Sequence, residues 1–335
     1  GGWDGGREAD PGGCQRWPGS VECAPRLFVI HTCLAFSMSQ HPTSDAAVTP
    51  AAGSVAASDA AASVAGHASG GTPLSVHGDR HFDGLADKFS ASLYGHLRGE
   101  LRLSLLDRLL PEMLDLEGQP VLDVGAGLGQ QAQWFLERGH AVTLAEPAGE
   151  MLDRAREAID AQGVETSRVR YLTSPLQDLA GEAPGPWPLV VCHAVLEWLG
   201  NPRAAIDRLA ALMAPGAQLS LMVFNRDALR FSNVVKGNYQ KALSDQLEGK
   251  GKRQRLTPIS PVTHDEICQW VGQNGLHIES VAGIRIFQDY VRQAPEKASD
   301  QATLLALEKQ YCQQDPHWRL GRYLLYTVTK PEANV

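Results

Sequence analysis

Short apolar runs alternate with amphipathic segments between residues 119 and 225. Short runs rich in Val, Leu and Ile predict buried strands, while longer segments with apolar residues three or four positions apart predict helices. The pattern indicates strands at 120–125, 141–147, 168–174, 188–195 and 218–224, and helices at 130–139, 149–163 and 202–216. This alternation is typical of parallel strands joined by crossover helices, so we expect a doubly wound α/β domain.

The pattern changes on both sides of this region. Residues 84–114 read as a helical lead-in that is interrupted at Tyr94-Gly95. After residue 225 we expect helices at 231–249 and 264–275, and a pair of closing strands at 277–287 and 323–330. The expected fold is therefore a Rossmann-like doubly wound sheet with a helical N-terminal lead-in and antiparallel closing strands.

The first 80 residues are expected to lie outside the folded domain, which we place at 82–331. Residues 1–37 are an irregular mixture of Gly, Pro, Trp and Cys, and we interpret them as a spurious extension upstream of a start at Met38. The apolar run 27–36 follows a glycine-rich, acidic lead that a signal peptide would not carry. Residues 39–80 are rich in Ala, Ser, Gly and Thr without an aromatic residue, which predicts disorder.

Composition narrows the class of protein. Hydrophobic residues make up 43% of the chain and charged residues 20%, as in globular proteins. A formal net charge of -8 argues against a surface that is basic everywhere, although a local basic patch can still bind RNA. The six cysteines form no CxxC pair, so we expect neither a metal site nor a disulfide framework and favour the reducing cytoplasm. No stretch approaches the roughly 20 apolar residues that span a bilayer.

A glycine-rich loop follows the first predicted strand in the sequence VLDVGAGLGQ, residues 121–130. Gly125, Gly127 and Gly129 stand between that strand and the next helix, where open α/β sheets bind their ligands. Glu146 ends the following strand about 20 residues later, where a carboxylate can accept hydrogen bonds from ribose hydroxyls. Together, the glycine-rich loop and Glu146 indicate an adenosine-containing cofactor.

Three features favour S-adenosylmethionine (SAM) over a nicotinamide cofactor. The loop is GxGxG preceded by Asp123, whereas a pyrophosphate is accommodated by GxGxxG. Leu176-Gln177-Asp178 follows the third strand, where we expect a polar contact near adenine. The sequence LMAPGAQLSL, with a helix, Pro-Gly and a strand in succession, is typical of class I methyltransferases. A purely structural glycine turn and nicotinamide binding remain the alternatives.

The segment after the fourth strand, CHAVLEW, bears on the methyl acceptor. It lacks the Asn/Asp-Pro-Pro-aromatic element that polarises an amine in DNA methyltransferases. His193 is expected either to contact SAM or the transferring group, or to be a packed histidine satisfied by backbone. Glu197 and Trp198 are expected to cap and pack the following helix. Because no general base is evident, we favour an acceptor that is already ionised, such as a carboxylate with a pKa near 4, and assign no catalytic residue.

Basic residues gather outside the predicted sheet, between residues 236 and 255. This segment holds two acidic residues, Asp245 and Glu248, against six basic ones: Lys236, Lys241, Lys250, Lys252, Arg253 and Arg255. A glycine-punctuated basic loop of this kind is a candidate for tracking RNA phosphates. A solvated loop without a partner is the alternative.

With these residues assembled, the chain resembles the bacterial tRNA 5-carboxymethoxyuridine methyltransferases, the CmoM family, over about residues 82–331. The generic part of the resemblance is VLDVGAGLGQ, ERGHAV, CHAVLEW and LSLMVFN. The more specific part is FDGLADKFSASLYGHLRGELR, GNY, KRQRLTPISP, GIRIFQDY and LGRY. The resemblance implies a SAM-dependent enzyme of tRNA modification that converts the acid 5-carboxymethoxyuridine, at the wobble position, into its methyl ester.

The resemblance also implies a set of cofactor contacts. They fall on Arg102, Gly125, Ala126, Glu146, Leu176, Gln177 and His193. Two of these depart from the family, since Ala126 stands where glycine can occur and Glu146 where aspartate can occur. Both changes are mild, because alanine is small and glutamate still offers two acceptors.

Residue type and expected location suggest which side chains hold the substrate. For the acid itself we consider Arg285, Tyr290, Arg322 and Tyr323, and for the tRNA backbone Lys252, Arg253 and Arg255. Two alternative functions stay open: a carboxyl or O-methyltransferase acting on a small molecule, and a SAM-binding protein without catalysis. The oligomeric state is not predicted.

Overall fold

The computed structural model describes residues 75, 78–80, 82, 97–248 and 257–333. The chain divides into two units, residues 1–68 and 69–335, and every described residue belongs to the second. The predictions for residues 1–74, for the first part of the lead-in with its interruption at Tyr94-Gly95, and for Lys250, Lys252, Arg253 and Arg255 therefore lie outside the described residues. Among the described helices, none has both the length and the apolar character needed to cross a membrane.

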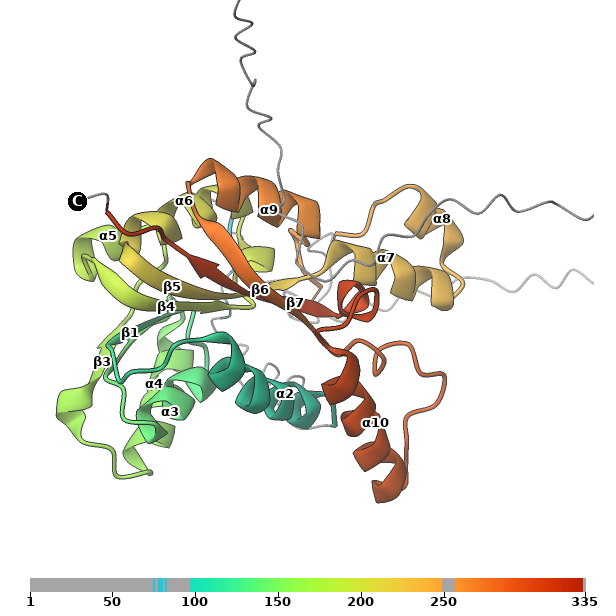
Figure 1. Ribbon diagram of the computed structural model, residues 1–335, viewed down its shortest axis with the longest axis horizontal. Coiled ribbons are helices and arrows are strands. Elements are labelled where there is room, and N and C mark those ends of the chain that lie inside the picture. Colours follow the sequence, from blue (N-terminus) through green and yellow to red (C-terminus); the bar gives the residue numbers. More distant parts are fainter. Residues whose placement is uncertain (1–74, 76–77, 81, 83–96, 249–256, 334–335) are drawn as a thin grey trace, which may run out of the picture. The chain divides into compact units, whose positions relative to one another are not determined.

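One seven-stranded sheet organises the second unit, in the order β3-β2-β1-β4-β5-β7-β6 (Figure 1). Its strands are β1 (Val121–Val124), β2 (Val142–Ala145), β3 (Val169–Leu172), β4 (Trp187–His193), β5 (Met213–Phe224), β6 (His277–Ile284) and β7 (Tyr323–Thr329). The first five strands pair in parallel, and β7 pairs antiparallel with both β5 and β6. The doubly wound sheet and its antiparallel closing strands are thereby confirmed.

Helices cover both faces of this sheet. They are α2 (Leu97–Met113), α3 (Gln130–Glu137), α4 (Gly149–Asp160), α5 (Leu179–Glu182), α6 (Pro202–Leu212), α7 (Arg226–Val235), α8 (Tyr239–Leu243), α9 (His264–Gln273) and α10 (Ala298–Tyr311), with 3-10 turns at Thr166–Arg168, Leu196–Trp198 and His317–Leu320. In Figure 1, α5, α6 and α9 lie on one face and α2, α3, α4 and α10 on the other. The pair α7–α8 follows the carboxyl end of β5.

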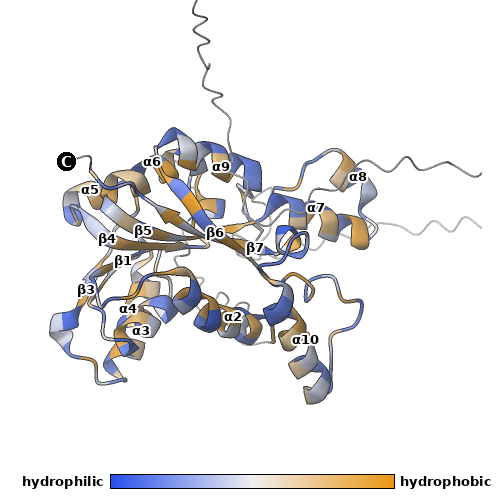
Figure 2. Cartoon of the chain, in the orientation of Figure 1, coloured by the Kyte–Doolittle hydropathy of each residue, from blue (hydrophilic) through white to orange (hydrophobic). Residues whose placement is uncertain are grey.

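The core consists mainly of two apolar layers, one on each face of the sheet. Leu122 and Ile206 belong to the layer beneath α6 and α9, while Leu105 and Phe135 belong to the layer beneath α2 and α3. Figure 2 shows the central strands as mostly hydrophobic and the helices as hydrophilic on much of their surface. Strands buried on both faces explain the continuous apolar runs in the sequence.

Three local features differ from the sequence prediction. The helix expected at 202–216 ends at Leu212, before Pro215, because β5 already begins at Met213. The helix expected at 231–249 is two helices, α7 and α8, separated by Gly237 with a left-handed φ of 76°. Helix α10 was not predicted.

Candidate cofactor and substrate site

A pocket lies beyond the carboxyl ends of β1, β2 and β4, and it encloses about 990 Å³ of empty space including its open mouth. All seven residues that the sequence predicts for the cofactor line it: Arg102, Gly125, Ala126, Glu146, Leu176, Gln177 and His193. The parallel strands bring these residues together from positions spread over 92 residues of chain, between 102 and 193. Apolar side chains and a few polar groups line this pocket together, as in sites that bind small molecules.

The glycine loop forms the floor of the pocket. Gly125 has a left-handed φ of 67°, and a Cβ atom built there would lie 2.4 Å from Cγ2 of Val195. The backbone N–H of Gly127 donates to Oε2 of Glu146 at 2.9 Å, and that of Ala148 donates to Oε1 at 3.0 Å. Glu146 is thus oriented by two backbone donors, and each oxygen can still accept a further hydrogen bond.

Asp123 lies at the end of β1, next to the glycine loop, with 2% of its surface exposed. Its Oδ2 atom has no hydrogen-bond partner. Burial and the nearby charge of Glu146 raise the pKa of Asp123 to about 7. A buried carboxylate in this state favours a ligand that brings a positive charge or an N–H donor.

Arg102 and His193 face the pocket from α2 and from the end of β4. Arg102 is 7% exposed, and its Nε atom has no hydrogen-bond partner. Nε2 of His193 lies 2.8 Å from the hydroxyl of Ser220, while Nδ1 has no partner. Burial and the charge of Arg102 lower the pKa of His193 to about 3, so the imidazole is neutral at physiological pH.

Two residues that the sequence does not mark, Asp79 and Phe82, lie beside or in the pocket. Gln177 donates from Nε2 to Oδ2 of Asp79 at 2.6 Å, and Asp79 also accepts from the backbone N–H of Gly200 at 2.8 Å. The ring of Phe82 packs edge-on against Trp198 at 4.9 Å, and both line the pocket. No periodic pattern marks Asp79 or Phe82 in the sequence, because they are fixed by tertiary contacts alone.

The residues present fit SAM. Its amino and carboxylate groups require opposite charges, which Asp123 and Arg102 offer as buried side chains with unpartnered atoms. Its ribose requires a carboxylate such as Glu146, and its adenine requires apolar walls with a polar edge, such as Leu176 and Gln177.

A second polar cluster lies next to this pocket. Nε and Nη2 of Arg285 donate to both oxygens of Asp289 at 2.6–2.8 Å, and Nη2 of Arg322 lies 3.4 Å from Oδ1 of Asp289. The three side chains are each 10% exposed or less. Burial alone would raise the pKa of Asp289, but the two guanidinium groups lower it overall. Among these three side chains, two buried cations share one anion.

Tyr323 connects the cluster to the pocket. The guanidinium carbon of Arg102 lies 5.4 Å from the centre of the Tyr323 ring, and that of Arg285 lies 5.8 Å from it. Nε of Arg322 is buried without a hydrogen-bond partner. Tyr290 takes another role, because its hydroxyl donates to the backbone carbonyl of Leu320 at 2.7 Å. The structure thus groups Arg285, Arg322 and Tyr323, whereas the hydroxyl of Tyr290 is engaged by backbone.

Glu308, on α10, holds the loop that carries Arg285 and Asp289. Its side chain is fully buried and accepts hydrogen bonds from the backbone N–H groups of Ile286, Phe287 and Gln288 at 2.7–2.9 Å. Arg285 itself has a left-handed φ of 63°. Because Glu308 is far from this loop in sequence, no local pattern could have assigned it this position.

The fold and the cofactor pocket together define a class I SAM-dependent methyltransferase. The model of the methyltransferase domain family matches residues 94–281. Two solved structures share the fold: a Haloferax volcanii methyltransferase in complex with its Trm112 activator (TM-score 0.50, 16% identity, 76% of this chain and 99% of that one) and the Synechocystis magnesium protoporphyrin IX methyltransferase with bound SAH (TM-score 0.51, 15% identity, 74% and 96%).

Curated relatives identify the family more closely. The tRNA 5-carboxymethoxyuridine methyltransferases of Escherichia coli O157:H7 and strain K12 are 37% identical over 259 residues, which cover 76% of this chain and 98% of each relative. The chain belongs to this family. It is also 31% identical over 211 residues to the ubiquinone biosynthesis O-methyltransferase of Xylella fastidiosa, with 59% of this chain and 80% of that relative covered.

Proposed function

We propose that the chain methylates the carboxylate of 5-carboxymethoxyuridine at the wobble position of tRNA, giving the methyl ester. The observation that carries this proposal is the buried cationic cluster of Arg285 and Arg322 beside a pocket suited to SAM. The family's relatives support the substrate by their name. A tRNA substrate implies the cytoplasm, and we assign the activity to residues 82–331, with residues 1–80 outside the catalytic domain.

In this proposal seven residues bind the cofactor. Arg102 pairs with the methionine carboxylate, Glu146 accepts from the ribose hydroxyls, and Leu176 with Gln177 contacts adenine. Gly125 and Ala126 allow close approach of the backbone. His193 presents its unpartnered Nδ1 to the ligand.

The substrate acid is held by the second cluster. The Nε group of Arg322, which lacks a partner, donates to the acid, and Arg285 supports it with a second buried charge. Tyr323 lies between this position and Arg102, so the acid and the cofactor meet at that ring. Asp289 keeps the two guanidinium groups in place while neutralising only one of them.

The reaction needs no proton transfer. When bound, SAM supplies a methyl group made electrophilic by its sulfonium. Arg285 and Arg322 would hold the substrate carboxylate so that one of its oxygens could take this methyl group, and the electron pair of the broken carbon–sulfur bond would stay on the sulfur of S-adenosylhomocysteine. Because the acid is ionised at neutral pH, the chain contributes by binding, alignment and exclusion of water rather than by a general base.

A small organic acid or phenol is the competing acceptor, and the similarity to the ubiquinone biosynthesis O-methyltransferase favours it as a second candidate. In the test, the purified chain is incubated with labelled SAM and one of two acceptors: tRNA that contains the acid, or the free nucleoside. Charge reversal at Lys252, Arg253 and Arg255 should then abolish methylation of tRNA but leave that of the free nucleoside unchanged. Equal loss on both substrates, or no loss on tRNA, would contradict a role of this loop in binding RNA.

A further inference from the structure

An exposed apolar surface lies on α7 and α8. Seven large hydrophobic side chains of the described residues are exposed, and five of them are on these two helices: Phe231, Val234, Val235, Tyr239 and Leu243. Tyr239 is 67% and Leu243 82% exposed. Figure 2 shows hydrophobic residues on both helices. A group of this kind at one place on a surface marks an interaction site.

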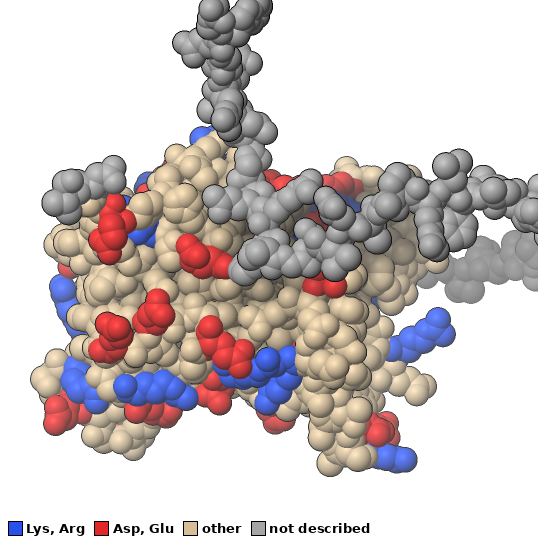
Figure 3. Space-filling view, in the orientation of Figure 1, with Lys and Arg blue, Asp and Glu red and all other residues tan. Residues whose placement is uncertain are grey.

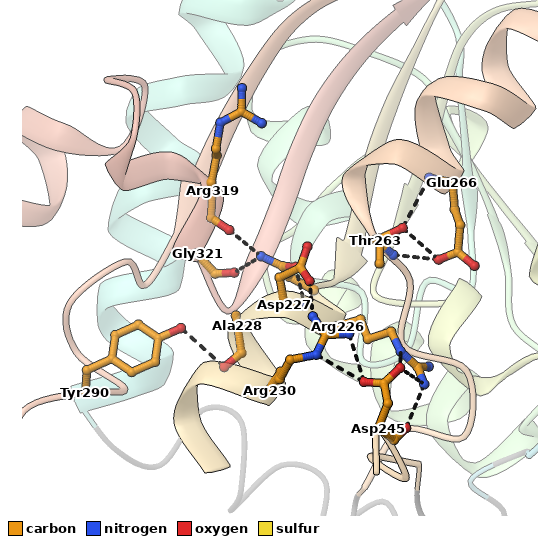
Figure 4. Close-up of polar contacts among 11 residues, drawn as sticks. Arg226, Asp227, Ala228, Arg230, Asp245, Thr263, Glu266, Tyr290, Arg319 and Gly321 are labelled. Carbon is orange, nitrogen blue, oxygen red and sulfur yellow. Dashed lines mark hydrogen bonds and ion pairs between the residues drawn. The ribbon is translucent and has the colours of Figure 1, made fainter. Parts of the chain in front are cut away.

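This surface is continuous with the proposed substrate site. The ring of Phe231 packs edge-on against that of Tyr290 at 5.0 Å. On the inward side of α7, Ser232 Oγ lies 3.5 Å from Nη2 of Arg322, and the carbonyl of Ala228 lies 3.4 Å from the Tyr290 hydroxyl (Figure 4). The helix therefore presents one face to the anion-binding cluster and the other to solvent.

Hydrogen bonds within the turn between the two helices hold the backbone next to Tyr239. The backbone N–H of Asn238 donates to the carbonyl of Asn233 at 2.8 Å, and its side-chain amide donates to Oδ1 of Asn233 at 3.2 Å. Asn233 in turn donates to the carbonyl of Leu229 at 2.8 Å. Gly237, with its left-handed φ, lies within this turn and allows the reversal.

Acidic side chains near the surface are already paired with arginines. The acidic Asp245 is bound by Arg226 and Arg230, as Figure 4 shows, and Glu248 pairs with Arg226 at 2.7 Å. Lys236 forms no ion pair with any residue that the structure describes.

The basic side chains form a group of their own. Burial lowers the pKa of Lys236, and the charges of Arg322, Arg98 and Lys241 lower it further, although Asp289 opposes them. These cations therefore lie close enough to repel one another. In Figure 3 positive and negative side chains are interspersed on the face in view.

We propose that the outward face of α7 and α8 binds the unpaired nucleotides that flank the target uridine. Bases would stack on Tyr239 and Phe231, and phosphates would pair with Lys236 and Lys241. Exposed aromatic rings beside unpaired lysines are the chemistry that binds single-stranded RNA without reading its sequence. A second copy of the chain would use the apolar residues but would leave the lysines without a role. This inference rests on the proposed tRNA substrate.

Steady-state kinetics with tRNA that carries the acid test the proposal. Tyr239→Ala should raise the KM for tRNA about tenfold, and Tyr239→Phe, which keeps the ring, should restore the parent value. Leu307→Ala, at an exposed position on α10 (40% against 67% for Tyr239), is the control and should behave like the parent. SAM binding in the same preparations reports that the domain is folded.

Salt dependence gives an independent readout. Lys236→Gln and Lys241→Gln should each lower the slope of log affinity against log salt concentration by about 0.7, the value for one phosphate contact on a single strand. A KM for tRNA within twofold of the parent in Tyr239→Ala would overturn the proposal. A variant that binds tRNA normally but loses self-association, or loses binding to anionic lipid vesicles, would also overturn the proposal. Failure of the parent to methylate tRNA would instead refute the proposed function.

Discussion

Arg285 and Asp289 form a buried, bidentate ion pair in which both carboxylate oxygens accept hydrogen bonds at 2.6–2.8 Å. Arg322 approaches the same carboxylate at 3.4 Å. One carboxylate thus holds two buried guanidinium groups. Such a site suits a substrate that brings its own carboxylate, because a buried cation is costly without an anion.

Arg322→Gln removes the cation assigned to the substrate and leaves the Arg285–Asp289 pair intact. We expect kcat/KM for tRNA to fall at least about 30-fold, because losing one partner of a buried charge pair costs about 2 kcal/mol or more. SAM affinity, measured by calorimetry, should not change. Arg319→Gln is the control, since Arg319 is exposed and pairs with Asp315. Equal activity in the two variants would contradict the assignment.

Gly125→Ala should abolish SAM binding, because the added Cβ meets Val195 at 2.4 Å in the floor of the pocket. Gly163→Ala is a matched control: its φ of 69° is also left-handed, but no atom lies within 4 Å of the added Cβ. Both variants should lose about 1–2 kcal/mol of stability from backbone strain. Only Gly125→Ala should lose the cofactor in equilibrium dialysis, and parallel behaviour of the two would count against the pocket.

Glu308→Gln tests whether the loop carrying Arg285 is held from α10. An amide can present only one acceptor oxygen to the three backbone donors, so we expect a loss of about 1–3 kcal/mol in the free energy of unfolding. The KM for tRNA should rise while the SAM dissociation constant stays the same, and the difference separates positioning from general destabilisation. A variant with lower stability but an unchanged KM for tRNA would show a structural role only.

His193 should make the native state sensitive to acid. Its pKa is lowered to about 3 in the folded chain from an ordinary value of 6.5, so between these values only the unfolded chain binds the proton. Stability contributed by the neutral imidazole is present above pH 6.5 and is lost as the pH falls. From pH 7 to 5.5 this loss is on the order of 1 kcal/mol.

The measurement is urea unfolding of the parent, His193→Asn and His277→Asn at both pH values. On acidification, His193→Asn should lose less stability than the parent. His277→Asn, at an exposed position, should lose as much as the parent. Burial raises the pKa values of Asp123 and Glu197 to about 7, so these two carboxyl groups add stability as the pH falls, and they do so in all three proteins. Identical acid sensitivity in all three would refute the assigned protonation state of His193.

The central strands could be predicted because they are buried on both faces, which gives continuous apolar runs in the sequence. The strand β1, Val121–Val124, and the following glycines also lie together in sequence, so the cofactor pocket was accessible to motif reasoning. Helix α10 could not be predicted from the sequence, because Leu304 faces the core while the nearby Leu307 is 40% exposed, and no apolar face stands out.

The remaining parts of the site depend on contacts between distant segments. Glu308 meets the 286–288 backbone across about 20 residues, and Asp79 meets Gln177 across 98. For the substrate site, residue type and expected location suggest Arg285 and Arg322 as candidates. The sequence does not show that the Tyr290 hydroxyl donates a hydrogen bond to the backbone carbonyl of Leu320.

The central claim is that the chain forms a methyl ester on a tRNA acid, and nucleoside mass spectrometry tests it most directly. The purified full chain is incubated with SAM and tRNA from cells that make 5-carboxymethoxyuridine but lack its ester. The account predicts that this nucleoside gains the mass of one methylene and that mild alkali, which cleaves esters, reverses the gain. Confirmed SAM binding without any change in that nucleoside would contradict the account.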